Sequence, residues 1–101
     1  MYCVIIFEVI VHFRDAETEL LWNTGKSRRI PPSIRRSAVR KLSILNAAVE
    51  LNNLTVPPGN QLEALGGDRK GQHSIRINNQ YRICFTWYAG NARDVEIVDY
   101  H

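Results

Sequence analysis

The chain ends in three residues that can each accept or donate a proton, Asp99, Tyr100 and His101. They directly follow the β-rich run "VEIV", so a strand is expected to carry them. Because a chain terminus is usually the least ordered part of a domain, one interpretation is a polar tail. The other is an active site built at the end of a strand.

Further proton carriers and cations lie in the same half of the chain: Glu63, Asp68, Arg69, Lys70, Arg76 and Arg82. These residue types suit metal-free cleavage of an RNA phosphodiester, which needs a base for the 2′-OH, cations for the charged phosphorane and an acid for the 5′-oxygen. Histidine fits proton transfer because its reference pKa is about 6.5. Arg69 and Arg82 could hold phosphate oxygens bidentately. Strand flanking, ion pairing and, for Asp68, turn formation are the structural alternatives.

Motifs for other chemistries are missing from the sequence. It has no HExxH, CxxC, P-loop, Rossmann glycine fingerprint or GxSxG. The three histidines, at positions 12, 73 and 101, form no ligand pair at helical spacing. We therefore expect neither a metal nor another cofactor.

Cations are concentrated in one segment. Seven of the thirteen Lys and Arg residues lie within sixteen positions, and no acid occurs between Glu19 and Glu50. Such a basic face attracts polyanions, although a solvated helix face without a partner is the alternative. The seven are Lys26, Arg28, Arg29, Arg35, Arg36, Arg40 and Lys41.

The N-terminal and cysteine patterns favour a cytoplasmic protein. The opening "MYCVIIFEVIVHF" lacks a basic region and a cleavage site, and it is too short for a membrane span. Cys3 and Cys84 match no metal or disulfide framework, so we expect reduced thiols, with Cys84 buried in a strand.

Periodicity predicts one α+β domain over residues 1–101. Residues 2–13 read as a strand, and Asp15 as the N-cap of a short helix that ends at Gly25. A second helix, over residues 32–49, carries an apolar stripe through Ile34, Ala38, Leu42, Leu45 and Val49, with its cations off the stripe and in water.

The remaining sequence alternates with a period of two. "QLEAL", "QHSIRIN", "YRICFTW" and "DVEIVDYH" are separated by loop and turn residues, which predicts an antiparallel meander covered by the helices on one side. Alternation also points Asp99 and Tyr100 to opposite faces of the last strand. They share a site only if the strand twists or bends.

Taken together, these residues resemble a known family. "VHFRDAETELLWNTGKSRRIPPSIRRSAVRKLSILNAA", "VPPGNQLEALGGDRKGQHSIRINNQYRICFTW" and "VEIVDYH" are closely similar to HigB toxins, including the GraT type, of the RelE-like superfamily. The resemblance runs from about Val11 to His101. It implies a microbial ribonuclease-like fold and a toxin that cleaves mRNA in the ribosomal A site without metal, leaving a 2′,3′-cyclic phosphate.

The resemblance also implies partners and site residues. The partners are a HigA-type helix-turn-helix antitoxin, which alone contacts operator DNA, and the ribosome with its mRNA. Asp99, Tyr100 and His101 match the family's catalytic trio, and Arg82 matches an arginine that stabilises the phosphate. The basic helix would meet ribosomal RNA or the antitoxin through Arg35, Arg36, Arg40 and Lys41.

Two positions depart from a branch of the family. Glu63 stands where that branch has histidine, and Gly66 where it has lysine. Glu63 is then the candidate base and Lys70 the candidate replacement cation, with Arg69 and Arg76 as further phosphate ligands. A non-catalytic module that binds RNA or ribosomes and acts mainly with the antitoxin in repression is the alternative function. A ribonuclease active on free RNA is a third.

Overall fold

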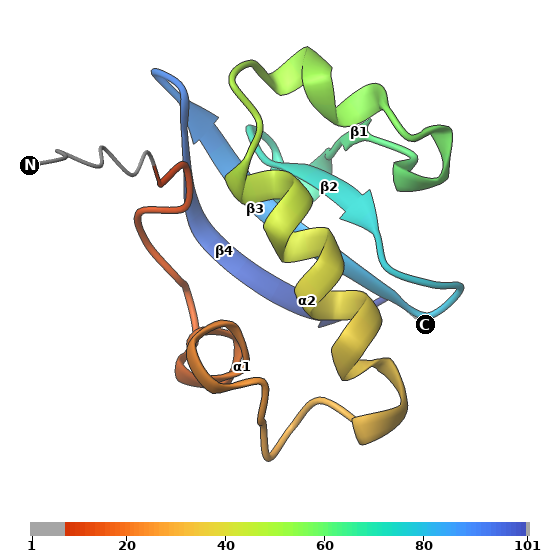
Figure 1. Cartoon of the computed structure of the whole chain (residues 1–101). Helices are drawn as coiled ribbons and strands as arrows, with labels where there is room; N and C mark the ends of the chain where they lie inside the picture. Colours follow the sequence, from red (N-terminus) through yellow and green to blue (C-terminus); the bar gives the residue numbers. More distant parts are fainter. Residues whose placement is uncertain (1–7, 101) are drawn as a thin grey trace, which may run out of the picture.

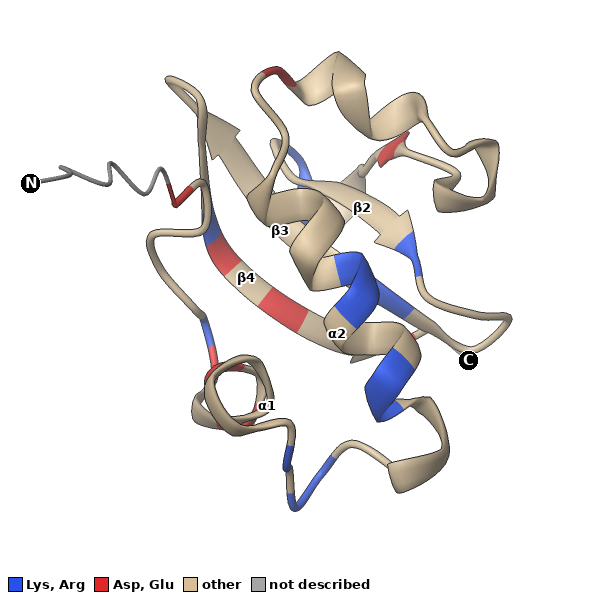
Figure 2. Ribbon diagram, in the orientation of Figure 1, with Lys and Arg blue, Asp and Glu red and all other residues tan. Residues whose placement is uncertain are grey.

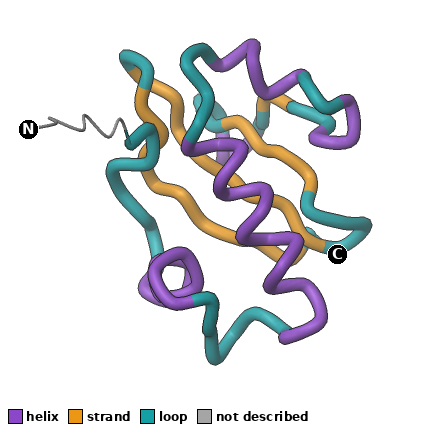
Figure 3. The backbone as a smooth tube through the Cα atoms, in the orientation of Figure 1, coloured by secondary structure: helices purple, strands orange, loops and turns teal. Residues whose placement is uncertain are grey.

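The computed structural model describes residues 8–100. Within them, helices α1 (Ala16–Thr24) and α2 (Pro32–Asn46) precede a four-stranded antiparallel sheet in the order β1-β2-β3-β4. Helix α2 crosses one face of the sheet, and α1 lies beside β4 (Figures 1 and 3). This confirms the α+β class and the predicted meander. The strands are β1 (Glu63–Ala64), β2 (His73–Arg76), β3 (Tyr81–Tyr88) and β4 (Asn91–Asp99).

The predicted strand over residues 2–13 lies largely outside the described residues. Its described part, from residue 8, forms no regular strand, so that part of the prediction is wrong. It makes two isolated parallel bridges to β4, Ile10 with Ala92 and Phe13 with Val95. The segment therefore covers part of the outer edge of β4, which would otherwise offer unpaired backbone groups.

Helix α1 begins and ends where the sequence predicts. The Asp15 carboxylate accepts a hydrogen bond from the Thr18 amide at 3.1 Å, and Gly25 ends the helix with a left-handed φ of 77°. The helix start also anchors β4, because the Thr18 hydroxyl accepts from the amide of Ile97 at 3.1 Å. Arg29 Nη1 donates to the carbonyl of Ile97 at 3.0 Å. Both polar backbone groups of Ile97, two residues before Asp99, are thus paired.

Helix α2 is shorter than predicted. It ends at Asn46, and Val49 is 79% exposed, outside the helix. The physical reason is a competing cap: Asn53 Oδ1 accepts from the amides of Val49 (3.1 Å) and Glu50 (2.8 Å) and begins a new 3-10 helix. The stretch predicted as a loop contains η1 (Leu51–Thr55) and η2 (Pro58–Asn60), and η3 (Gly67–Arg69) lies in the predicted turn.

One apolar cluster joins α2 to the sheet. Since residues two apart on a strand share a face, the alternating isoleucines of β2, β3 and β4 all point toward α2. The central fully or almost fully buried members are Ala38, Leu42, Leu45, Ile75, Ile83, Phe85 and Ile97. No helix in the described part of the chain is long and apolar enough to cross a membrane.

Candidate active site on the polar face of the sheet

The strand register places the polar side chains of the sheet on the face away from α2. Glu63 pairs with Ser74, Ser74 with Cys84, and Cys84 with Glu96, and residues paired across strands share a face. Arg82 lies on the same face, two residues from Cys84. We call this surface the polar face, defined by Glu63, Ser74, Arg82, Cys84 and Glu96.

Arg82 is the most deeply placed cation of the polar face. Its side chain is 9% exposed. Nε donates to the Ser74 hydroxyl at 2.7 Å, and Nη2 donates to the carbonyl of Gln61 at 2.5 Å. Nη2 also lies 4.0 Å from a carboxylate oxygen of Glu63. Within residues 8–100 no hydrogen bond uses Nη1, so this nitrogen can still donate to a phosphate.

Arg69 reaches the polar face from η3. Its Nη1 donates to Glu96 Oε1 at 2.7 Å and to Gln72 Oε1 at 3.0 Å. The hydrogen bond that Arg69 donates to Glu96 raises the pKa of Arg69. Arg69 is thus a cation held in place by Glu96 and Gln72.

Asp99 and Tyr100 stand at the end of β4. Asp99 pairs with Tyr81 and accepts from Gln80 Nε2 at 3.0 Å, on the face that carries the core isoleucines. Tyr100, whose amide donates to the Gln80 carbonyl at 2.6 Å, directly follows β4. The divergence of the two side chains stays a prediction. His101, the third member of the expected trio, lies outside the described residues.

The other expected phosphate ligands are dispersed. Glu63 is half exposed at the Arg82 end of the polar face. Lys70 is exposed just after η3. Arg76 pairs with Arg82 across β2 and β3, and its guanidinium donates to the side chain of Asn79. The structure therefore brings Arg82 and Glu63 together and places Arg76 opposite Arg82 on the neighbouring strand, whereas Lys70 lies at the end of η3.

The basic face of α2 is smaller than predicted. Arg36 and Arg40 are exposed, as the periodicity indicates. Figure 2 shows in blue the segments of α2 that carry Lys and Arg. Lys41 is only 7% exposed and donates to Asn60 Oδ1 at 2.6 Å, so its expected place in water is wrong. Arg35 is half-buried because it donates to the backbone carbonyls of Ile30 (2.9 Å) and Ser27. Burial, followed by the fields of neighbouring arginines, lowers the pKa of Lys41.

Cys84 lies at the centre of the polar face and is fully buried as a free thiol, as predicted. Burial raises its pKa, which keeps the thiol protonated and unreactive near neutral pH. Cys3 lies outside the described residues. Among those described, no group of three His, Cys, Asp or Glu side chains could hold a metal ion.

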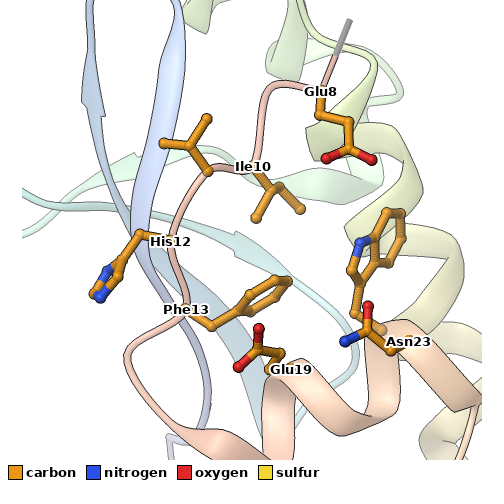
Figure 4. Close-up of a pocket in the computed structure, with 8 residues that line it drawn as sticks. Glu8, Ile10, His12, Phe13, Glu19 and Asn23 are labelled. Atoms are coloured by element: carbon orange, nitrogen blue, oxygen red, sulfur yellow. The ribbon is translucent and has the colours of Figure 1, made fainter. Parts of the chain in front are cut away.

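A hollow elsewhere on the molecule contains none of the expected site residues. It encloses about 460 Å³ between the segment from residue 8 to 13 and α1. Phe13 and Glu19 approach each other there, whereas His12 points away from the other labelled side chains (Figure 4). His12 instead accepts from the Asp94 amide at 3.2 Å. The candidate site is therefore the polar face and not this hollow.

Sequence reasoning missed two residues that organise the cations. Ser74 and Glu96 each hold an arginine, Arg82 and Arg69 respectively. Both stand at polar positions of alternating strands, so alternation alone could have placed them on the face of Arg82. Their specific pairings depend on register and on the path of η3, which no local pattern contains.

Comparisons with known proteins show the family to which the chain belongs. Residues 11–101 match the family model described as HigB-like toxin, the RelE-like toxin of the type II toxin-antitoxin system HigB. Toxin HigB-1 of Vibrio cholerae is 45% identical over 83 residues, 81% of this chain and 87% of that protein. An uncharacterised Haemophilus influenzae protein is 34% identical over 91 residues, 89% of each chain. Endoribonuclease HigB of Proteus vulgaris is 28% identical over 93 residues, 92% of this chain and all of that protein.

The two helices followed by a four-stranded antiparallel sheet are an α+β arrangement consistent with a RelE-like fold. The family match covers nearly the whole chain. The chain belongs to the HigB-like family of RelE-like toxins, whose type II systems pair a toxin with an antitoxin.

Proposed function

We propose that this toxin is an endoribonuclease that cleaves mRNA in the ribosomal A site without metal. The observation that carries the proposal is the pair of arginines, Arg82 and Arg69, at the polar face. Each guanidinium is hydrogen-bonded through some of its nitrogens and has others without a hydrogen bond within residues 8–100. In this part of the chain no hydrogen bond uses Nη1 of Arg82, or Nε and Nη2 of Arg69, whose Nη1 binds Glu96 and Gln72. The relative named an endoribonuclease supports the same reaction class.

The reaction requires no covalent enzyme intermediate. A base removes the 2′-OH proton, the 2′-oxygen attacks phosphorus, and the bond to the 5′-oxygen breaks as an acid protonates that oxygen. The products are a 2′,3′-cyclic phosphate and a 5′-hydroxyl, so no water is consumed. Guanidinium groups stabilise the additional negative charge of the phosphorane.

We assign roles as follows. Arg82 and Arg69 stabilise the phosphorane, with Lys70 and Arg76 attracting the flanking RNA backbone. His101, with Tyr100 and Asp99, supplies proton transfer at the chain end, and Glu63 beside Arg82 is a second candidate base. The partners are a HigA-type antitoxin, the ribosome and its mRNA. Operator DNA is contacted through the antitoxin alone.

A growth assay tests this function in cells. Expression of the wild-type chain should arrest growth, and co-expression of the antitoxin should relieve the arrest. His101→Ala, and separately deletion of the last two residues, should abolish the arrest while the protein still folds and binds antitoxin. A truncated protein that remains fully toxic would exclude the catalytic assignment of the tail.

Glu63 and Gly66, at the two positions that depart from the branch with histidine and lysine, favour a second candidate function. The chain would then bind ribosomes or antitoxin without cleaving RNA. In that case His101→Ala would leave toxicity unchanged, whereas charge reversal at Arg36 and Arg40 would reduce it. The two functions thus give opposite results in the same assay.

A further inference from the structure

Glu96 is a carboxylate among the cations of the polar face, and the proposed reaction gives it no role. Its side chain is 15% exposed in the C-terminal half of β4. Oε1 lies 2.7 Å from Arg69 Nη1 and 3.8 Å from Arg14 Nε. Gln72 Oε1 accepts from the same Arg69 nitrogen at 3.0 Å. Glu96 therefore links β4, η3 and the segment before α1.

The hydrogen bonds leave one edge of Arg69 open. Nη1 makes the bonds to Glu96 and Gln72, and within residues 8–100 no hydrogen bond uses Nε or Nη2. A guanidinium binds phosphate most strongly when two N–H groups on one edge donate in parallel. The Arg69 side chain is 31% exposed, so that edge is accessible.

The place of Glu96 along β4 determines where the guanidinium of Arg69 is held. Glu96 lies in β4 three residues before Asp99, the last residue of the strand. Arg69 Nη1 is bound to Glu96, which holds the guanidinium against the C-terminal half of this strand. The open edge thus belongs to a cation that is held at the polar face, which also carries Arg82.

We propose that Glu96 is a positioning residue that orients Arg69, so that its Nε–Nη2 edge binds the scissile phosphodiester of RNA. This inference rests on the proposed function for the identity of the substrate. Glu96 lowers the net positive charge of the site, yet it fixes a long side chain that would otherwise sample many rotamers. Orientation of a charged group before the reaction is a main source of transition-state stabilisation.

Single-turnover cleavage on mRNA-programmed ribosomes gives the first test. Glu96→Gln preserves shape and removes the charge, and we expect the cleavage rate at saturating ribosomes to fall about tenfold, with ribosome affinity within about twofold of wild type. The matched control is Glu19→Gln on exposed α1, which should cleave at the wild-type rate. In an Arg69→Ala background, Glu96→Gln should cause no further loss. A wild-type rate for Glu96→Gln, or an additive loss in the double variant, would overturn the inference.

A second test does not depend on cleavage. Inorganic phosphate is titrated into the full chain while the Arg69 Nε–H signal is followed by NMR. The wild-type signal should shift saturably, and the apparent Kd should rise several-fold in Glu96→Gln but not in Glu19→Gln. Equal titrations in all three proteins would refute the positioning role.

The two tests separate failure of the inference from failure of the proposed function. If phosphate binding depends on Glu96 but the mRNA on the ribosomes is not cleaved, the positioning role holds and the ribonuclease function is wrong. If cleavage occurs without any dependence on Glu96, the reverse applies. Glu96→Asp, which retains the charge, replaces Glu96→Gln should the latter fail to fold, and its shorter side chain should weaken phosphate binding less than Glu96→Ala.

Discussion

The Ser74 hydroxyl accepts a 2.7 Å hydrogen bond from Arg82 Nε, across the boundary between β2 and β3. Ser74 is fully buried, and Arg82 as a whole residue is 7% exposed, so water cannot replace this hydrogen bond easily. A buried guanidinium must be hydrogen-bonded to remain inside a protein. The serine therefore stabilises the buried guanidinium of Arg82, to which we assign phosphate binding.

Ser74→Ala should lower both stability and cleavage. The substitution removes the acceptor of a charged donor, and we expect the free energy of unfolding to fall by about 1–3 kcal/mol. Urea denaturation measures the loss, with exposed Ser33→Ala as the control, expected within about 0.5 kcal/mol of wild type. Equal stabilities for the two variants would show that the Ser74–Arg82 bond contributes nothing.

Lys41 should make stability depend on alkaline pH. Burial lowers its pKa in the folded state from 10.5, so between the folded value and 10.5 the unfolded chain binds more protons. The folded state therefore gains stability relative to Lys41→Met as pH rises through this range. Urea denaturation at pH 7, 9 and 10 measures the difference, with exposed Lys70→Met as the control.

A difference between wild type and Lys41→Met that stays constant across this pH range would contradict the lowered pKa. So would an equal pH dependence in Lys70→Met. The geometry supplies the reason for expecting otherwise, because the ammonium is buried and its acceptor, Asn60 Oδ1 at 2.6 Å, is a neutral amide oxygen without a negative charge to offset the burial. Within residues 8–100 no carboxylate forms an ion pair with Lys41.

Arg36 and Arg40 should serve binding more than chemistry. Both are exposed on α2, away from the polar face. Arg36→Glu with Arg40→Glu should weaken ribosome binding at least tenfold at low salt and reduce its salt dependence, while the cleavage rate at saturating ribosomes stays within about twofold. The control, Lys26→Glu with Arg93→Glu, reverses the same number of exposed charges elsewhere.

Titration of ribosomes and of antitoxin separates the two partners proposed for this helix. Unchanged ribosome affinity with a weakened antitoxin complex would assign Arg36 and Arg40 to the antitoxin. Equal losses in the control variant would mean that net charge alone matters. Only a loss specific to the α2 variant supports a ribosomal role for the helix.

Local sequence signals predicted much of the fold. Asp15 and Gly25 fixed α1 through capping and a left-handed turn, and alternation identified β2, β3 and β4. The end of α2 escaped prediction because Asn53 caps Val49 and Glu50 from a later turn. Such side-chain caps compete with a helix whose apolar periodicity alone would continue.

The site was predictable in composition but not in arrangement. The sequence predicts that Arg82 and Arg69 bind phosphate. Their pairing with Ser74 and Glu96, however, depends on strand register. Lys41 was misplaced because helical periodicity puts it beside Arg40, whereas η2 folds over it and supplies Asn60. A tertiary contact from another segment overrides an amphipathic pattern in this case.

The central claim is that the chain cleaves mRNA on the ribosome with its terminal residues. The most direct measurement adds the purified protein to bacterial ribosomes paused on a defined mRNA and maps both new ends. We predict cleavage within the A-site codon, a 2′,3′-cyclic phosphate, no cleavage without ribosomes and none with His101→Ala. Intact ribosome binding with no cleavage by the wild-type protein would contradict the account.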